Sequence, residues 1–125
     1  MTYSQTPIRQ IHAGETIQFS FPILNPDGTP ASYNSPVAEF ALSAHAFPLA
    51  GEILPVFKNS PGNGATILKV GQTWTVTVSF SHSDTLSISS GLHYYSLDVI
   101  DGADQSVVSE GILEILPMPI LGPVV

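Results

Sequence analysis

The chain has 125 residues, a length typical of one globular domain. Hydrophobic residues make up 43% of it and charged residues only 10%, a balance opposite to that of disordered chains. The only basic residues are Arg9, Lys58 and Lys69, set against ten acidic ones, which argues against binding to nucleic acid or to an anionic membrane surface. The absence of cysteine rules out disulfide scaffolds and thiol catalysis, and no apolar run approaches the ~20 residues of a membrane helix.

The N-terminal part predicts short strands separated by turns that are rich in proline. A weak strand is expected near residues 8–12. Residues 15–21 alternate between apolar and polar side chains, with Phe19 and Phe21 on the same face, and this period of two is typical of a half-buried strand. The segment 25–30, Asn-Pro-Asp-Gly-Thr-Pro, has the composition of a turn.

The next stretch fits two structures. Residues 36–47 alternate as a strand does, but Ser35 as a cap and Pro36 at the first position would also suit a short helix. We favour the strand because the neighbouring segments are strands. Further weak strands are expected near 52–58 and 64–69, joined by a turn rich in glycine and proline.

Residues 73–81 carry the clearest strand pattern of the chain. Trp74 and Phe80 fall on the apolar face, whereas the other face carries only threonine and serine. We therefore expect Trp74 in the core. The polar segment that follows is too short for a central strand, and residues 83–86 predict a capped single helical turn between two strands.

A long hairpin is expected at the C-terminal end of the domain. Residues 92–100 and 105–116 are apolar runs joined by an Asp-Gly turn. The alternation predicts that Val107 and Leu113 point inward, with Gly111 at a bulge or a close contact. The total is seven to eight short strands with regularly spaced turns, which predicts an all-β antiparallel sandwich.

The candidate metal ligands do not form a pattern that favours a metal site. The nearest pair is His82 with Asp84, and a zinc site requires three or four converging ligands. The carboxylates Asp98, Asp101 and Asp104 could hold calcium, but they lack the spacing of an EF-hand, and a hairpin turn uses the same residues. We therefore expect no metal and no cofactor.

Catalysis is not favoured either. Glu110 and Glu114 would lie on the outward face of the last strand, and such a pair could serve a glycosidase, but a sandwich of this size rarely builds the long cleft required. No nucleophile motif or phosphate-binding loop occurs. Tyr33, Tyr94 and Trp74 could stack on sugar rings, and of these Tyr94, on an outward face, is the best surface candidate.

The C-terminal segment is uncharged and strongly apolar. We expect a single sandwich domain over 1–116, followed by an extended tail over 117–125. An exposed apolar tail is a liability on an isolated molecule, so the tail is expected to bind another subunit, although docking on its own domain is the alternative. Its expected partner-binding residues are Ile120, Leu121, Val124 and Val125, together with Tyr94 on the domain itself.

A set of motifs in the second half resembles a known group of proteins. They are the segments 71–78, 83–86, 90–99 and 110–115, the last beginning Glu-Gly and preceded by the Asp-Gly hairpin. Over roughly residues 70–116 they resemble small Ig-like β-sandwich proteins encoded by tailed phages and prophages. They are also similar to the N-terminal domains of phage baseplate upper proteins.

This resemblance implies an Ig-like fold and a non-enzymatic structural role in a tailed-phage virion. The chain would be assembled in the host cytoplasm and packed, in several copies or as a homo-oligomer, onto other virion proteins of the tail, baseplate or fibre region. Two alternatives stay open at this point. One is a capsid decoration protein on the head shell, and the other is a carbohydrate-binding or host-attachment module.

Overall fold

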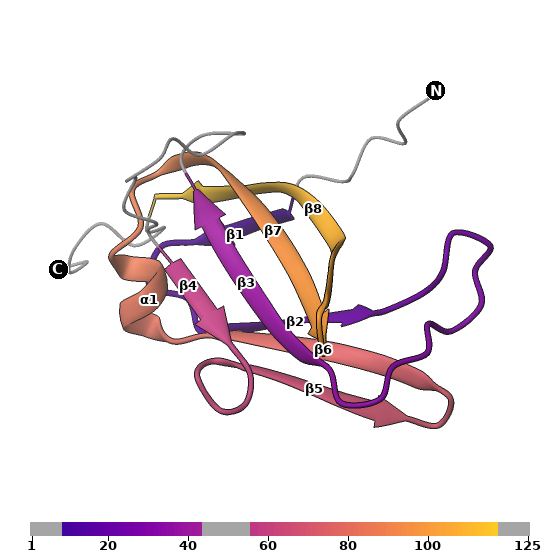
Figure 1. Cartoon of the computed structure of the whole chain (residues 1–125). Coiled ribbons are helices and arrows are strands. Elements are labelled where there is room, and N and C mark those ends of the chain that lie inside the picture. Colours follow the sequence, from indigo (N-terminus) through magenta and orange to yellow (C-terminus); the bar gives the residue numbers. More distant parts are fainter. Residues whose placement is uncertain (1–8, 44–55, 118–125) are drawn as a thin grey trace, which may run out of the picture.

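The computed structural model describes residues 9–43 and 56–117. The strands in these ranges form two sheets, one of five strands in the order β1-β8-β7-β3-β4 and one of three strands in the order β2-β6-β5 (Figure 1). The elements, in chain order, are β1 (Arg9–His12), β2 (Ile17–Pro22), β3 (Val37–Ser43), β4 (Val56–Asn59), β5 (Ala65–Val70), β6 (Thr73–Phe80), α1 (His82–Leu86), β7 (Gly91–Asp101) and β8 (Asp104–Leu116).

The strand order is that of an Ig-like sandwich. In such folds the second, fourth and fifth strands of the basic set form one sheet and the third, sixth and seventh form the other, often with an added edge strand. Here the sheet β2-β6-β5 corresponds to the first set, and β8-β7-β3, with β4 at its edge, corresponds to the second. The predicted all-β sandwich with eight strands is therefore confirmed for the described residues.

One strand pair departs from the expected antiparallel arrangement. The first strand, β1, runs parallel to the last, β8, with Arg9 opposite Leu113 and His12 opposite Leu116. The two strands lie at opposite ends of the sequence and are joined by no local turn. Their relative direction is therefore set by the path of the whole chain between the sheets, and the local patterns used to find the strands carry no information about it.

The segment that fitted both a strand and a helix forms the strand β3 over Val37–Ser43. It lies in the interior of the five-stranded sheet, between β4 and β7. Its side chains Ala38, Phe40 and Leu42 are fully buried and the intervening ones are not, which is the period of a strand. The pairing with β7 satisfies backbone groups that a helix would have satisfied internally.

A chain of aromatic rings joins the two sheets. Phe40 of the large sheet stacks on Tyr95 with ring centroids 5.7 Å apart, and it meets Phe80 of the small sheet edge-on at 5.6 Å. Phe80 in turn meets Phe19 edge-on at 5.7 Å. Offset and edge-on contacts of this kind stabilise beyond the area they bury. This cluster is the centre of the core.

Arg9 closes one side of this aromatic cluster. Its guanidinium carbon lies 5.1 Å from the ring centroids of both Phe19 and Phe21. This cation–π geometry lets a charged side chain on the inner side of β1 cover the gap between β1 and β2. Arg9 therefore has a structural role, and its charge interacts with aromatic rings of the core.

The helical turn is confirmed, and its cap is Ser81. The Ser81 Oγ accepts a hydrogen bond from the Asp84 backbone N–H, and the Asp84 carboxylate accepts one from the Ser81 backbone N–H. Asp84 also receives Lys58 Nζ from β4 at 2.7 Å. The capping box begins the helix, and the ion pair ties it to the edge of the five-stranded sheet.

A bulge in β8 overturns one prediction. Leu97 pairs with Ser109 whereas the next residue, Asp98, pairs with Val107, so Val108 is an extra residue in β8. A one-residue insertion moves all side chains before it to the opposite face. Val107 is therefore 58% exposed on the outer side, not inward as expected. Leu113, beyond the bulge, is buried as predicted.

Two finer predictions also need correction. Gly111 was expected at a bulge or a close contact, and the bulge is ruled out because Gly111 lies opposite Tyr95 in a regular part of the ladder. Trp74 packs against the core and meets Tyr33 edge-on at 6.4 Å, but it is only half-buried because it lies at an end of the sandwich. The apolar face of β6 was nevertheless assigned correctly, since Val76, Val78 and Phe80 are buried.

Candidate functional site

The residues considered for metal binding are used in local structure. Nowhere in residues 9–43 and 56–117 do three His, Cys, Asp or Glu side chains group in a way that could hold a metal ion. His82 Nδ1 donates to the Gly14 carbonyl at 2.5 Å, and Asp84 takes part in the helix cap. His93 is buried and its Nε2 donates to the Ser89 carbonyl at 2.7 Å. No described helix is long and apolar enough to cross a membrane.

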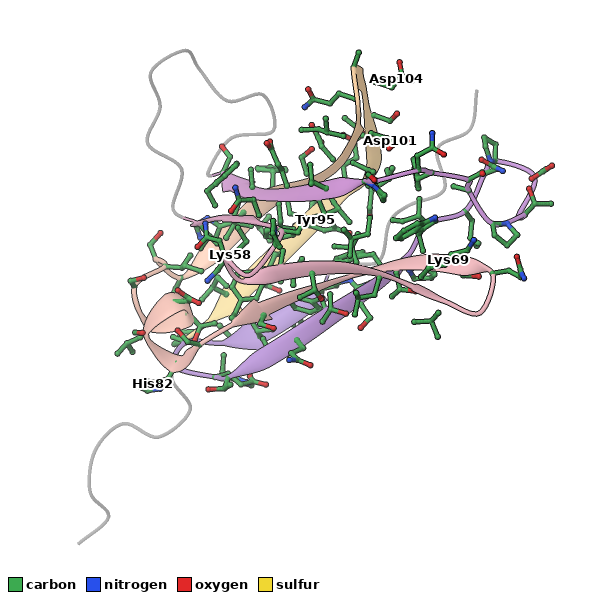
Figure 2. All side chains as sticks on the ribbon, turned by 60° about the horizontal axis from the view of Figure 1, so that its bottom comes forward. Lys58, Lys69, His82, Tyr95, Asp101 and Asp104 are labelled. Atoms are coloured by element: carbon green, nitrogen blue, oxygen red, sulfur yellow. The ribbon has the colours of Figure 1, made fainter. Side chains whose placement is uncertain are left out.

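Asp101, near the hairpin turn, holds a neighbouring loop in place. Asp101 accepts the backbone N–H groups of Asn34 and Ser35, each at 3.0 Å, and so fixes the loop before β3 against the β7–β8 turn. Burial raises the pKa of Tyr33, which lies in the same loop, and the negative charge of Asp101 raises it further. Figure 2 shows Asp101 and Asp104 at the hairpin, at the end of the molecule away from His82.

The three aromatic residues considered for sugar stacking do not all lie together. Tyr33 and Trp74 meet at the loop end of the sandwich, where both are half-buried. Tyr94 lies on β7, between Ser43 of β3 and Ile112 of β8, with its side chain on the outer side of the five-stranded sheet. The sequence thus placed Tyr94 correctly on an outward face, and the structure separates it from the other two.

The outer side of the five-stranded sheet combines carboxylates with exposed apolar side chains, and we call it the acidic face. Its outward positions follow from strand alternation and register: Val37, Glu39 and Ala41 on β3; Phe57 and Asn59 on β4; Leu92, Tyr94, Ser96, Asp98 and Ile100 on β7; Gln105, Val107, Glu110, Ile112 and Glu114 on β8; and Gln10 and His12 on β1. No lysine or arginine of the described strands points outward here. The face therefore presents negative charge without a counter-ion of its own.

Carboxylates on this face lie close to one another. Glu39 of β3 is directly opposite Asp98 of β7, and like charges in directly opposite positions destabilise a sheet. Asp98 accepts hydrogen bonds from Ser96 Oγ at 3.0 Å and Gln105 Nε2 at 2.9 Å, both from neutral groups. Those bonds hold the carboxylate in place without supplying a positive charge.

The two glutamates that the sequence analysis weighed as a glycosidase pair, and did not favour, lie on this same face in different surroundings. Glu110 is opposite Ser96, whereas Glu114 is opposite Leu92 and accepts a hydrogen bond from Gln10 Nε2 at 2.7 Å. The pairing of Glu114 with a side chain of β1 fixes it at the far side of the sheet. Both glutamates contribute negative charge to the acidic face.

Apolar side chains border these carboxylates. Phe57 on the edge strand β4 is 46% exposed, and Leu92 on β7 is 49% exposed, two residues before Tyr94 on the same strand. The sequence analysis named Tyr94 but missed Phe57 and Glu39. That they share a face with Tyr94 becomes visible only once the register of β3 against β4 and β7 is known, because alternation alone does not say which strands share a sheet.

The outer side of the three-stranded sheet has a different composition, and we call it the hydroxyl face. Its outward positions are Gln18, Ser20 and Pro22 on β2, Thr73, Thr75, Thr77 and Ser79 on β6, and Thr66, Leu68 and Val70 on β5. None of them is charged. Some bond across the strands, such as Gln18 Nε2 to Ser79 Oγ at 3.2 Å and Ser20 to Thr77 at 3.5 Å.

The remaining predicted partner-binding residues lie outside the described part of the chain. They are Ile120, Leu121, Val124 and Val125 of the apolar tail. Their role stays a prediction from the sequence.

The comparisons with known proteins add no identification. No protein-family model matches the chain, and no curated protein matches its sequence significantly.

Proposed function

We propose that this chain is a non-enzymatic structural component of a tailed-phage virion that binds a neighbouring virion protein through the acidic face. The observation that carries the proposal is the combination, on one sheet surface, of unbalanced carboxylates with Tyr94, Phe57 and Leu92. Aromatic and aliphatic anchors supply most of the binding energy of an interface, and complementary charges supply orientation and specificity. The sequence motifs over residues 70–116 supply the link to phage particles.

The charge of this face defines the partner. A second copy of the same face would bring like charges together, which costs several kcal/mol in an interface. The complementary surface is therefore one that carries lysine or arginine together with apolar side chains. In the tail, baseplate or fibre region such a surface would belong to a different virion protein.

The test is incorporation into particles. Virions assembled with Glu39→Lys and Glu110→Lys together should lose the chain, measured as copies per particle by mass spectrometry. The matched control is Gln18→Lys with Ser20→Lys, which places two lysines on exposed positions of β2, at the side of the hydroxyl face away from β5, and should leave incorporation unchanged. Equal incorporation of both double variants would contradict the proposal. Copy number in wild-type particles separates a tail location from decoration of the head shell, because a shell carries many more copies.

The apolar tail supplies a second part of the proposed attachment. Ile120, Leu121, Val124 and Val125 would bind the same or a neighbouring virion protein. Deletion of residues 117–125 should leave the domain folded, as judged by circular dichroism, but should reduce incorporation. Normal incorporation of the truncated chain would remove the tail from the proposal.

A second candidate function is supported by the aromatic pair at the loop end. Tyr33 and Trp74 meet at the end of the sandwich that carries the β2–β3, β5–β6 and β7–β8 connections. In Ig-like domains these loops often carry a recognition site, and aromatic rings bind sugars. A glycan array probed with wild type and with Tyr33→Ala tests this role, and Tyr94→Ala is the control. Binding that survives Tyr33→Ala would argue against it.

A further inference from the structure

The edge strand β5 differs from the rest of the surface. Within the described chain it pairs with β6 only, and Figure 1 shows it at the lower rim of the molecule. Leu68 and Val70, both on its outer side, are 63% and 67% exposed, the highest values among the exposed large hydrophobic residues described. Open edges of this kind present unpaired backbone groups that can template another strand.

The ladder shows which backbone groups of β5 are directed to the open edge. The Ser79 backbone N–H donates to the Gly64 carbonyl at 2.8 Å, so these two residues form a hydrogen-bonded pair next to β5. Hydrogen-bonded and non-hydrogen-bonded pairs alternate along antiparallel strands. Leu68 therefore directs its N–H and C=O to β6, whereas Ile67 and Lys69 direct theirs away from the sheet.

The first residue of β5 is already engaged on this side. The Ala65 carbonyl accepts the Gly62 backbone N–H at 3.3 Å. The backbone groups that remain for pairing at the edge are thus centred on residues 67–69, with Leu68 in the middle.

Charge selects the occupant of this edge. With a net charge of −7, the molecule repels its own copies over most approaches. The hydroxyl face, to which Leu68 and Val70 belong, carries no charged side chain in the described strands, so a second copy can approach there without that repulsion. A basic partner of the kind that suits the acidic face would gain no electrostatic attraction from the uncharged hydroxyl face.

We propose that two copies of this chain associate by antiparallel pairing of their β5 strands, with Leu68 on the two-fold axis. In this register Ile67 of each copy forms a hydrogen-bonded pair with Lys69 of the other, and the two Leu68 side chains lie directly opposite each other on the outer side. The result is one continuous sheet of six strands. Thr66 faces Val70 of the second copy, an uncharged pair with high β propensity.

The Leu68-centred register also accommodates Lys69. A lysine on an edge strand commonly prevents pairing, because two copies would bring the charges together. Here each Lys69 is opposite Ile67, so the two ammonium groups do not face each other, and their side chains lie on the inner side of the sheet, away from Leu68. Two strands of six residues form a small interface, so we expect a monomer–dimer equilibrium that depends on concentration.

The absence of native cysteine allows a direct test of the register. Leu68→Cys would place two thiols in a non-hydrogen-bonded pair, where Cα atoms lie about 4.5 Å apart, within the range of a disulfide. Under mild oxidation of the purified chain we expect a covalent dimer on a non-reducing gel. Leu92→Cys, 49% exposed on the acidic face, is the matched control and should remain monomeric. Equal cross-linking of the two variants would overturn the proposal.

A second pair of variants tests the backbone pairing itself. Lys69→Pro removes an N–H that is directed to the open edge and leaves the hydrogen bonds to β6 in place. Lys69→Ala removes the same charge but keeps that N–H. Sedimentation velocity over a concentration series should show a dimer for wild type and Lys69→Ala. For Lys69→Pro the dissociation constant of the dimer should rise at least tenfold. Circular dichroism checks that both variants are folded.

The outcomes separate this proposal from the one above. A wild-type chain that is monomeric at every concentration overturns the dimer, as does a folded Lys69→Pro variant that dimerises as well as Lys69→Ala. Because only the purified chain is used, neither result bears on binding of a virion protein through the acidic face. Conversely, normal incorporation of the glutamate variants, which contradicts the proposed function, would leave the dimer proposal intact.

Discussion

The two outer faces of this sandwich are built in the same way and yet differ sharply in chemistry. Each strand directs alternate side chains to a shared core, so Val76, Val78 and Phe80 of β6 and Tyr95, Leu97 and Val99 of β7 are all buried. On the outer sides, β7 carries Tyr94 and Asp98 with carboxylates beside them, whereas β6 carries only threonine and serine. Packing in the core restricts the residue types at the inner positions, whereas it does not restrict those at the outer positions.

This contrast shows where to look for binding surfaces on this domain. A surface that only keeps the protein soluble mixes charges of both signs. The acidic face holds one sign and places Glu39 opposite Asp98, at a cost in stability, and the hydroxyl face holds no charge at all. Each departure is the basis of one of the proposed contacts, with a basic virion protein in the first case and with a second copy of the chain in the second.

The largest expected effect comes from breaking the core that the two faces share. Phe40→Ala should lower the free energy of unfolding by about 3–5 kcal/mol, because it removes the ring that contacts both Phe80 and Tyr95. Phe57→Ala is the control, since this phenylalanine on the neighbouring strand points outward and is 46% exposed. Urea denaturation followed by the fluorescence of the single tryptophan measures both. Similar losses would mean that the inner and outer sides of the sheet are assigned wrongly.

The loop end, where the two sheets meet, should be less sensitive. Trp74→Ala is expected to cost about 1–3 kcal/mol, below the range for a fully buried tryptophan, because Trp74 is half-buried. The loss should come from its contacts with the core and with Tyr33. Thermal denaturation monitored by circular dichroism measures it, and a loss as large as that of Phe40→Ala would show that Trp74 is a central core residue after all.

The ion pair between Lys58 and Asp84 holds the five-stranded sheet to the helix that follows β6. Burial by itself raises the pKa of Asp84, but the hydrogen bonds from Lys58 and Ser81, with the charge of Lys58, outweigh it and the net pKa lies below its ordinary value of 3.8. Asp84→Asn should cost about 1–2 kcal/mol at neutral pH, a modest value because both side chains are partly exposed.

The lowered pKa of Asp84 also predicts a pH dependence. The folded state holds the carboxylate more strongly ionised than the unfolded state does, so its contribution to stability is complete above the unfolded pKa of about 3.9 and is lost as the pH falls through the folded value. Urea midpoints measured between neutral pH and about pH 3 should therefore converge for wild type and Asp84→Asn. Asp104→Asn, a change at an exposed hairpin residue, is the control and should follow wild type.

The smallest effect is a gain. Glu39→Gln should raise the free energy of unfolding by about 0.2–1 kcal/mol, because it removes one of two like charges in directly opposite positions. Added salt should reduce the gain by screening that repulsion. On the hydroxyl face, Thr75→Glu should change stability by less than about 0.5 kcal/mol. A loss of stability in Glu39→Gln would show that this carboxylate has a stabilising role within the domain.

Local sequence was enough to predict most of the elements. The alternation in β2, β6 and β7, the capped turn at α1 and the hairpin between β7 and β8 all depend on residues within a few positions of one another, and such patterns act through short-range geometry. The β-sandwich followed from the number of strands and the spacing of the turns, whereas its Ig-like character was implied by the resemblance over residues 70–116. The outward position of Tyr94 could be predicted for the same reason.

The tertiary structure alone decided which outward residues share a face. The parallel pairing of β1 with β8, the bulge at Val108 that turns Val107 to the surface, and the place of Glu39 opposite Asp98 each depend on residues far apart in the chain. Strand register and sheet order are set by the packing of the whole core, and a one-residue change in register exchanges inner and outer side chains. The sequence therefore determined which residues form strands, and the packing of the two sheets determined the charge and the open edge that each face presents.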